Sequence, residues 1–148
     1  LDPARGAWTG RRWHYRLQDP AHGATELARL QPAPDATYLV LERDDLQGDA
    51  ARFKQVLAFT LDPATAASGR VVVDLLRIAD PCRLATADGR FRFPFWTPEC
   101  LVVVDPRTLL VAADNNYPAA GGRSPDARGP TEWICVRSRA ARGLAASP

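Results

Sequence analysis

The sequence is poor in the residues on which nucleophilic and metal chemistry most often depend. It has two histidines, three cysteines and no methionine among 148 residues. The cysteines show neither a CxxC pair nor Cys/His spacing, so a zinc site is not expected. No serine lies in a Gly-x-Ser-x-Gly elbow, which argues against a Ser-His-Asp mechanism. No apolar run reaches the roughly 18 residues of a membrane-spanning helix, so we expect no membrane span.

An excess of either charge is also lacking. Lys and Arg total 19 against 17 Asp and Glu, which gives a net charge of +2. The arginines are scattered along the chain rather than clustered in one segment, so no nucleic-acid partner is expected. Only one of the basic residues is a lysine, Lys54.

The chain begins at Leu1 and contains no methionine, so we expect a processed chain or a piece of a longer protein. Under that expectation, the lack of a visible signal peptide says nothing about export. Two of the cysteines, Cys100 and Cys135, fall on apolar segments of one expected sheet. Two interpretations stay open for this pair: buried thiols that act as small hydrophobic residues, or a disulfide formed in an oxidising compartment.

What the sequence does contain is an internal repeat. Residues 26–44 and 99–116 each begin with an acidic residue, continue through an apolar strand, a Pro/Asp turn and a second apolar strand, and end in a polar tip. A supersecondary unit that recurs along a chain is typical of solenoids, propellers and arrays. Propellers are built from blades of four antiparallel strands, and residues 25–78 supply four successive strand patterns.

We therefore predict an all-β fold, a β-propeller fragment of about two antiparallel and mostly four-stranded blades, from the C-terminal part of a larger propeller. The expected units are an outer strand and linker from a preceding blade (1–24), a blade (25–78), an irregular connection (79–98), a final incomplete blade (99–137) and a flexible tail (138–148). Because two blades cannot close a ring, the remaining blades of the parent propeller are expected partners.

Polar residues gather at the strand ends of both repeat copies. Each first strand begins with a glutamate, and the second strands end in Glu42-Arg43-Asp44 and in Asp114-Asn115-Asn116. Calcium favours six to eight oxygen ligands at flexible spacing, so a ring of such carboxylates could hold Ca²⁺. The expected metal ligands are Glu26, Glu42, Asp44, Glu99 and Asp114. Arg43 and Lys54 are the candidates to receive a phosphate or carboxylate.

Structural interpretations of the same residues stay open. The Asp114 tip could simply cap a turn through side-chain to backbone hydrogen bonds. Glu42 and Arg43 could belong to ion pairs across the sheet, and the aspartates that follow Arg43 could be solvated loop residues.

Several strings have a familiar order: Tyr-Leu-Val-Leu-Glu-Arg-Asp (38–44), Phe-Lys-Gln-Val-Leu-Ala-Phe-Thr-Leu-Asp (53–62), Phe-Pro-Phe-Trp-Thr-Pro-Glu-Cys (93–100), Leu-Leu-Val-Ala-Ala-Asp-Asn-Asn-Tyr-Pro (109–118) and Thr-Glu-Trp-Ile (131–134). Together they resemble the C-terminal part of the "esterase-like activity of phytase" family of bacterial phytase-like proteins. The resemblance spans most of residues 25–137, and the first twenty-odd residues match only loosely. One departure is Trp96-Thr97-Pro98 before Glu99, where an aliphatic residue usually precedes the acid.

The resemblance implies a periplasmic or secreted β-propeller that hydrolyses phosphate or carboxylic esters of small molecules. Propeller phytases, to which the family is distantly similar, use Ca²⁺ held by channel carboxylates to bind phosphate and activate water. By position, the resemblance marks eight polar residues: Glu42, Arg43, Asp44, Lys54, Glu99, Asp114, Asn115 and Asn116. We assign Glu99 and Asp114 to catalysis and Arg43, Lys54, Asn115 and Asn116 to substrate binding. The alternative is a non-catalytic propeller that binds a ligand or a protein, and a lactonase-like or sugar-dehydrogenase-like propeller would use similar metal rings.

Overall fold

The protein is described here by a computed structural model that covers residues 4–18, 26–33, 37–61, 69–116, 123 and 131–138. Within these residues the fold is all-β, with one short 3₁₀ helix at Gly48–Ala50. The strands in chain order are β1 (Glu26–Pro32), β2 (Thr37–Arg43), β3 (Lys54–Thr60), β4 (Arg70–Asp74), β5 (Ile78–Ala79), β6 (Arg90–Phe91), β7 (Pro98–Asp105), β8 (Thr108–Ala113) and β9 (Trp133–Arg137). The described residues include no helix that is both long and apolar enough to cross a membrane.

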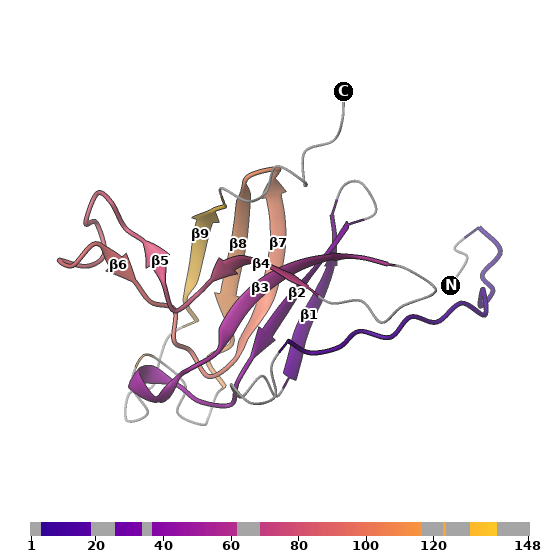
Figure 1. Cartoon of the computed structure of the whole chain (residues 1–148), viewed down its shortest axis with the longest axis horizontal. Coiled ribbons are helices and arrows are strands. Elements are labelled where there is room, and N and C mark those ends of the chain that lie inside the picture. Colours follow the sequence, from indigo (N-terminus) through magenta and orange to yellow (C-terminus); the bar gives the residue numbers. More distant parts are fainter. Residues whose placement is uncertain are drawn as a thin grey trace.

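The two repeat copies form two antiparallel sheets. The first sheet has the strand order β1-β2-β3-β4 and the second has the order β7-β8-β9. Figure 1 shows the sheets packed side by side, and the first strands of the two copies, β1 and β7, are in contact. This arrangement of successive sheets confirms the prediction of a β-propeller fragment of about two blades, and the described residues form no closed ring.

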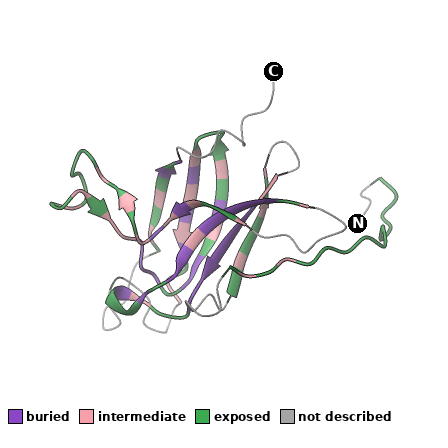
Figure 2. Cartoon of the chain, viewed as in Figure 1, coloured by how far each residue is buried: buried purple, intermediate pink, exposed green. Residues whose placement is uncertain are grey.

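The main core lies between the two sheets. Alternate residues of β2 and β3, including Leu39, Leu41 and Val56, pack toward buried residues of the second sheet such as Leu101 and Val111. Figure 2 shows that β2 and β3 are buried almost throughout, while burial alternates along β8. The two central strands of the first sheet, β2 and β3, are therefore covered on both faces, and β8 is covered on one.

The second face of the first sheet is covered by the N-terminal segment. Val40, Leu57 and Phe59 form a small buried cluster against which Tyr15 packs, with the Tyr15 and Phe59 ring centres 4.8 Å apart. The backbone of Gly69 lies close against this cluster, and only glycine fits there, because a Cβ atom at Gly69 would lie 2.6 Å from Cβ of Leu57. In its described part the segment holds only isolated bridging residues and no regular strand.

The connection between the sheets is more ordered than its irregular sequence suggests. It contains the β5–β6 hairpin, which projects at the left of Figure 1. Phe93 and Phe95 then insert into the main core with exposed fractions of 0% and 2%. Their rings lie 4.6 Å apart, so the aromatic residues of this connection help to fill the space between the blades.

The outer face of the second sheet carries exposed apolar side chains. Val102 and Val104 of β7 and Trp133 of β9 are 38%, 57% and 66% exposed. Apolar side chains grouped on one exposed face mark an interaction surface.

The cysteines are free thiols. Cys100 lies on β7 and Cys135 on β9, and β8 separates the two strands. Cys135 is exposed and Cys100 is half-buried, so neither the disulfide nor the buried-thiol interpretation describes this pair.

Candidate functional site

The strand ends of the two copies meet at one end of the sheets, the lower end in Figure 1. Across the first sheet Glu26 lies opposite Arg43, and Arg43 lies opposite Lys54. In the second sheet Pro98 lies opposite Ala113, which places Glu99 and Asp114 at the corresponding strand ends. The register therefore places the polar strand ends of both repeat copies at the same end of the molecule.

Arg43 is the centre of this site. Its Nη2 lies 2.7 Å from Glu26 Oε2 and 3.8 Å from Glu99 Oε1, and its Nη1 lies 3.0 Å from Asp45 Oδ1. The arginine side chain is 5% exposed, whereas those of Glu26 and Glu99 are 50% and 48% exposed. One buried guanidinium therefore links the first strands of both blades, and the three carboxylates around it leave a negative balance of charge.

A second ion pair lies buried directly behind Arg43. Lys54 Nζ is 2.5 Å from Asp44 Oδ1, and the two side chains are 0% and 3% exposed. The same ammonium donates to the backbone oxygens of Asp44 at 2.6 Å and of Trp96 at 3.4 Å. Lys54 thereby ties the end of the first sheet to the segment that leads into the second.

Asp44 also holds the loop that joins β2 to β3. Its Oδ2 accepts the backbone N–H groups of Arg52 at 2.7 Å and Phe53 at 2.9 Å, and its Oδ1 accepts that of Leu46 at 3.3 Å. Burial opposes ionisation of this carboxyl, but the bond from Lys54 and the two backbone amides prevail and lower its pKa. Burial lowers the pKa of Lys54, and the charge of Asp44 opposes that shift.

Glu42 faces the N-terminal segment rather than the other site carboxylates. Its fully buried carboxylate accepts the phenolic O–H of Tyr15 and the backbone N–H of Gln18, the latter at 3.0 Å. Burial, the hydrogen bond to Glu42 and its charge all raise the pKa of Tyr15. Glu42 therefore fastens residues 15–18 to the first sheet.

Replacing Tyr15 with Phe is expected to destabilise the protein by about 1–3 kcal/mol, because the buried Glu42 carboxylate loses one of the two donors that the described residues supply. Tyr38→Phe is a matched control: its ring also lies near Phe59, at 5.7 Å, and its hydroxyl makes no hydrogen bond to the described part of the chain. Urea unfolding of both variants measures the difference. An equal effect of the two substitutions would show that the Tyr15–Glu42 bond contributes nothing.

The Asp114 tip forms a compact turn with the strand entry of the second sheet. The Asp114 N–H donates to the backbone oxygen of Thr97 at 2.9 Å, and the Asn116 N–H donates to Asp114 Oδ1 at 3.3 Å. Asn116 Nδ2 also bonds to Thr97 Oγ1, and Asn116 adopts a φ of 50°. These bonds support the turn-capping interpretation of Asp114 and Asn116, while the exposed Asp114 side chain and half-buried Asn115 lie beside the site.

The predicted metal ligands do not form one calcium site within the described residues. No group of three or more His, Cys, Asp or Glu side chains there could hold a metal ion. The chemistry of the carboxylates explains this: Glu26 and Glu99 face a guanidinium, Asp44 faces an ammonium, and Glu42 faces a phenol. The described residues alone therefore make no Ca²⁺ site, and a site that uses these carboxylates would need further ligands from outside the described residues.

Three features of the site were not identified from the sequence as functional. Asp45 is a third carboxylate at Arg43, Thr97 orders the Asp114 tip, and Tyr15 reaches the buried carboxylate of Glu42. The signal for Asp45 was its position directly after the Glu42-Arg43-Asp44 tip. Tyr15 gave no signal, because it reaches Glu42 from a distant segment.

Comparison with known proteins gives one match. A family model described as "Phytase-like: Esterase-like activity of phytase" matches residues 1–117. No curated protein and no solved structure matches the chain. The matched range includes the N-terminal residues that the sequence motifs matched only loosely, and it ends before the last strand, β9. The chain belongs to the Phytase-like family, described as having the esterase-like activity of phytase.

Proposed function

We propose that this chain is part of a hydrolase that acts on phosphate or carboxylic esters, with its reaction site where β1 and β7 begin. The observation that carries the proposal is the position of Arg43, whose guanidinium lies between Glu26 and Glu99 at the shared end of both blades. A fixed cation in a largely buried setting is suited to balance the oxyanion that develops when an ester is attacked.

In this proposal Glu99 is the general base. Its contact with Arg43 is the longest of the three at 3.8 Å, and its side chain is half-exposed, so it can turn toward a water molecule. The water oxygen attacks the ester centre and its proton passes to Glu99, while Arg43 balances the charge on the ester oxygen. The ester C–O or P–O bond then breaks, and the leaving oxygen takes up the proton that Glu99 accepted from the water, passed on through the Asp114 carboxylate at the neighbouring strand end, so that both carboxylates are restored.

The remaining predicted residues have supporting roles. The fully buried Lys54 acts through Asp44, by holding the loop next to Arg43 rather than by meeting the substrate. Asn115 and Asn116 follow Asp114 in the chain, and in this proposal their amide groups bind the alcohol part of the ester.

The balance of charge favours an uncharged ester. Three carboxylates surround the Arg43 guanidinium, so a phosphate monoester would be repelled more strongly than a carboxylic ester. Calcium would offset this repulsion, which keeps the calcium prediction open as a condition of the test.

The test is hydrolysis of p-nitrophenyl acetate and p-nitrophenyl phosphate by the 148-residue chain, each with added Ca²⁺ or with EGTA. We expect acetate turnover that survives EGTA and phosphate turnover that requires Ca²⁺. Arg43→Lys keeps the charge but loses the forked geometry, so it should lower kcat/KM about tenfold or more. Arg90→Lys, at an exposed position on β6, is the control.

The second candidate function is a propeller that binds a ligand or a protein without catalysis. It is favoured by the engagement of every predicted carboxylate in a hydrogen bond or ion pair. Folded protein with no turnover of either ester under either condition would select this function and reject the hydrolase.

We also propose that the protein works in the periplasm or outside the cell and that it packs against further blades. The family resemblance supports the location, and the exposed face of Val102, Val104 and Trp133 supports the packing. Fractionation of cells that carry the native gene tests the location, and recovery of the protein only in the cytoplasm would contradict it.

A further inference from the structure

The second sheet ends at an open strand edge beside a hollow. Within the described residues β9 pairs with β8 alone, and β4 pairs with β3 alone, so each is an edge strand. A hollow of about 880 Å³ lies along both. It is lined by consecutive residues of β4 (Val72–Asp74) and by consecutive residues at the end of β9 (Cys135–Ser138). Because neighbouring residues of a strand point to opposite faces, this lining follows the strand edges.

The internal repeat indicates what shape fits this hollow. The strands β1, β2 and β3 of the first sheet correspond to β7, β8 and β9 of the second, and the first sheet then adds β4. The equivalent position beside β9 has no strand among the described residues. An extended polypeptide has the shape of the hollow, and it could pair with the N–H and C=O groups of β9, as in strand addition to an exposed sheet edge.

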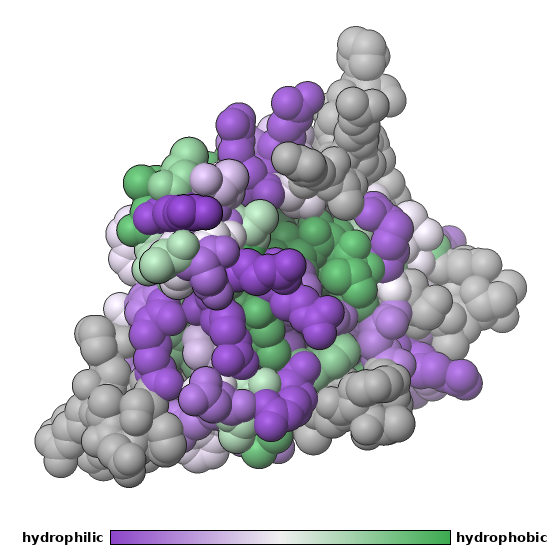
Figure 3. All heavy atoms as spheres, turned by 60° about the vertical axis from the view of Figure 1, so that its left-hand side comes forward, coloured by the Kyte–Doolittle hydropathy of each residue, from purple (hydrophilic) through white to green (hydrophobic). Residues whose placement is uncertain are grey.

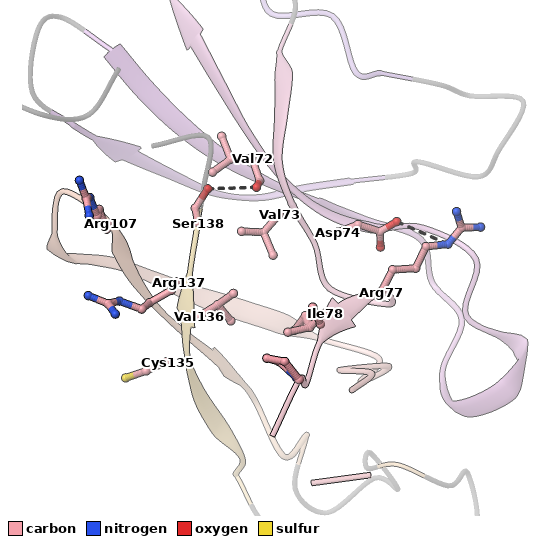
Figure 4. A pocket seen from close by; sticks show the side chains of 12 residues that line it. Val72, Val73, Asp74, Arg77, Ile78, Arg107, Cys135, Val136, Arg137 and Ser138 are labelled. Atoms are coloured by element: carbon pink, nitrogen blue, oxygen red, sulfur yellow. Dashed lines mark hydrogen bonds and ion pairs between the residues drawn. The ribbon is translucent and has the colours of Figure 1, made fainter. Parts of the chain in front are cut away.

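The charges around the hollow indicate the chemistry of its ligand. Arg77, Arg107 and Arg137 line it against one carboxylate, Asp74, which lies 3.9 Å from Nε of Arg77. In Figure 4 the guanidinium groups of Arg107 and Arg137 lie together at one side of the hollow, and Arg77 lies at the opposite side. Asp105 is close to this pair, but its carboxylate accepts the backbone N–H of Arg107 at 2.7 Å and does not line the hollow.

The floor of the hollow is apolar. Val73 and Val136 are buried, and Val72 and Ile78 are half-buried beside them. Figure 3 turns this side of the molecule toward the reader and shows apolar atoms recessed behind hydrophilic side chains. A strand paired with β9 would place alternate side chains over this floor and the others on the face of Arg137.

We propose that the hollow between β4 and β9 is a docking site for an extended peptide segment of another polypeptide, with alternating apolar and acidic side chains. Its apolar side chains cover Val73 and Val136, and its carboxylates pair with Arg107 and Arg137. A second copy that pairs through its own β9 is a poor occupant, because that strand (Trp133–Arg137) carries no carboxylate to meet Arg107 and Arg137. This site is separate from the Arg43 end, and it does not depend on hydrolase activity.

The probe is a synthetic peptide, acetyl-Thr-Val-Glu-Val-Glu-Val-Thr-amide, titrated into the 148-residue chain by calorimetry. We expect saturable binding that weakens with salt. Combined Arg107→Glu and Arg137→Glu should weaken it about tenfold or more, since both partner charges are reversed. Combined Arg29→Glu and Arg90→Glu, an equal charge change at two exposed positions outside the hollow, should leave the affinity within about twofold.

A second peptide separates strand pairing from charge attraction alone. The same sequence with N-methyl groups on alternate residues keeps every charge but loses the N–H groups of one edge, so it should bind at least tenfold more weakly. Hydrogen exchange should show new protection of residues 133–137 with the unmodified peptide. Equal binding of both peptides, displacement by inorganic phosphate alone, protection of residues 133–137 before any peptide is added, or dimerisation of the free chain would each overturn the proposal.

Discussion

Replacing Asp44 with Asn is expected to lower the free energy of unfolding by about 3–5 kcal/mol, the usual cost of removing one partner from a buried ion pair. The Lys54 ammonium is 0% exposed, and without the carboxylate its remaining partners among the described residues are the backbone oxygens of Asp44 and Trp96. The new side-chain amide also has a single acceptor oxygen, so it cannot accept from both the Lys54 ammonium and the backbone N–H groups. Its N–H group would face either the ammonium or the backbone donors of Arg52 and Phe53.

The control is Asp49→Asn in the same loop, where the carboxylate is fully exposed and its contact with Arg92 is 3.4 Å long. Exposed pairs of this kind contribute about 0–1 kcal/mol, so this variant should resemble the wild type. The double variant Asp44→Asn/Lys54→Met should recover part of the loss, because no charge then stays buried alone. Equal stability of Asp44→Asn and Asp49→Asn in urea would contradict the assignment.

The stability difference should also depend on pH in a defined direction. Lys54 and the backbone amides lower the pKa of Asp44 in the folded protein relative to the unfolded chain. The Asp44 carboxylate therefore contributes its full stability above its pKa in the unfolded chain, which is about 4. This stability is lost as the pH falls through the lower pKa of the folded protein. The difference in free energy of unfolding between the wild type and Asp44→Asn should accordingly become smaller as the pH falls below about 4.

The fold followed from the sequence because the repeat is local. The patterns of Tyr38–Arg43 and Phe53–Leu61 lie within a few residues of the observed β2 and β3, and each sheet forms between strands that are close in the chain. The aromatic connection was harder to interpret. Phe93 and Phe95 lie among prolines and show no strand alternation, yet they fill the main core, because the space between two sheets must be filled whatever the local structure.

The site was partly predictable for the same reason. Equivalent positions in a repeat come to equivalent positions in space, so Glu26 and Glu99 meet at Arg43. Burial at the strand ends could not be deduced from residue type. Lys54 looks like an exposed anion ligand in the sequence, but it lies where the two sheets and the β2–β3 loop close over it. Likewise, the partner of Glu42 depends on how a distant segment folds back over the first sheet.

Replacing Glu99 with Gln is expected to reduce kcat for p-nitrophenyl acetate about a hundredfold or more, the usual contribution of a general base. This prediction rests on the proposed hydrolase function. The substitution keeps the size of a side chain that is 48% exposed and whose nearest contact with Arg43 is 3.8 Å, so the stability of the protein should change by less than about 1 kcal/mol. Circular dichroism and urea unfolding check that the fold is retained.

The repeat supplies the matched control, because Glu26 occupies the equivalent position in the first blade and has a similar exposure of 50%. Its 2.7 Å contact with Arg43 is short, so Glu26 serves mainly to hold the guanidinium. Glu26→Gln should therefore raise KM or shift stability slightly while it leaves kcat within about tenfold of the wild type. If both glutamines reduced kcat equally, Glu99 would be a second holder of Arg43 and not the base. If neither did, the reaction would have to be sought away from this end of the blades.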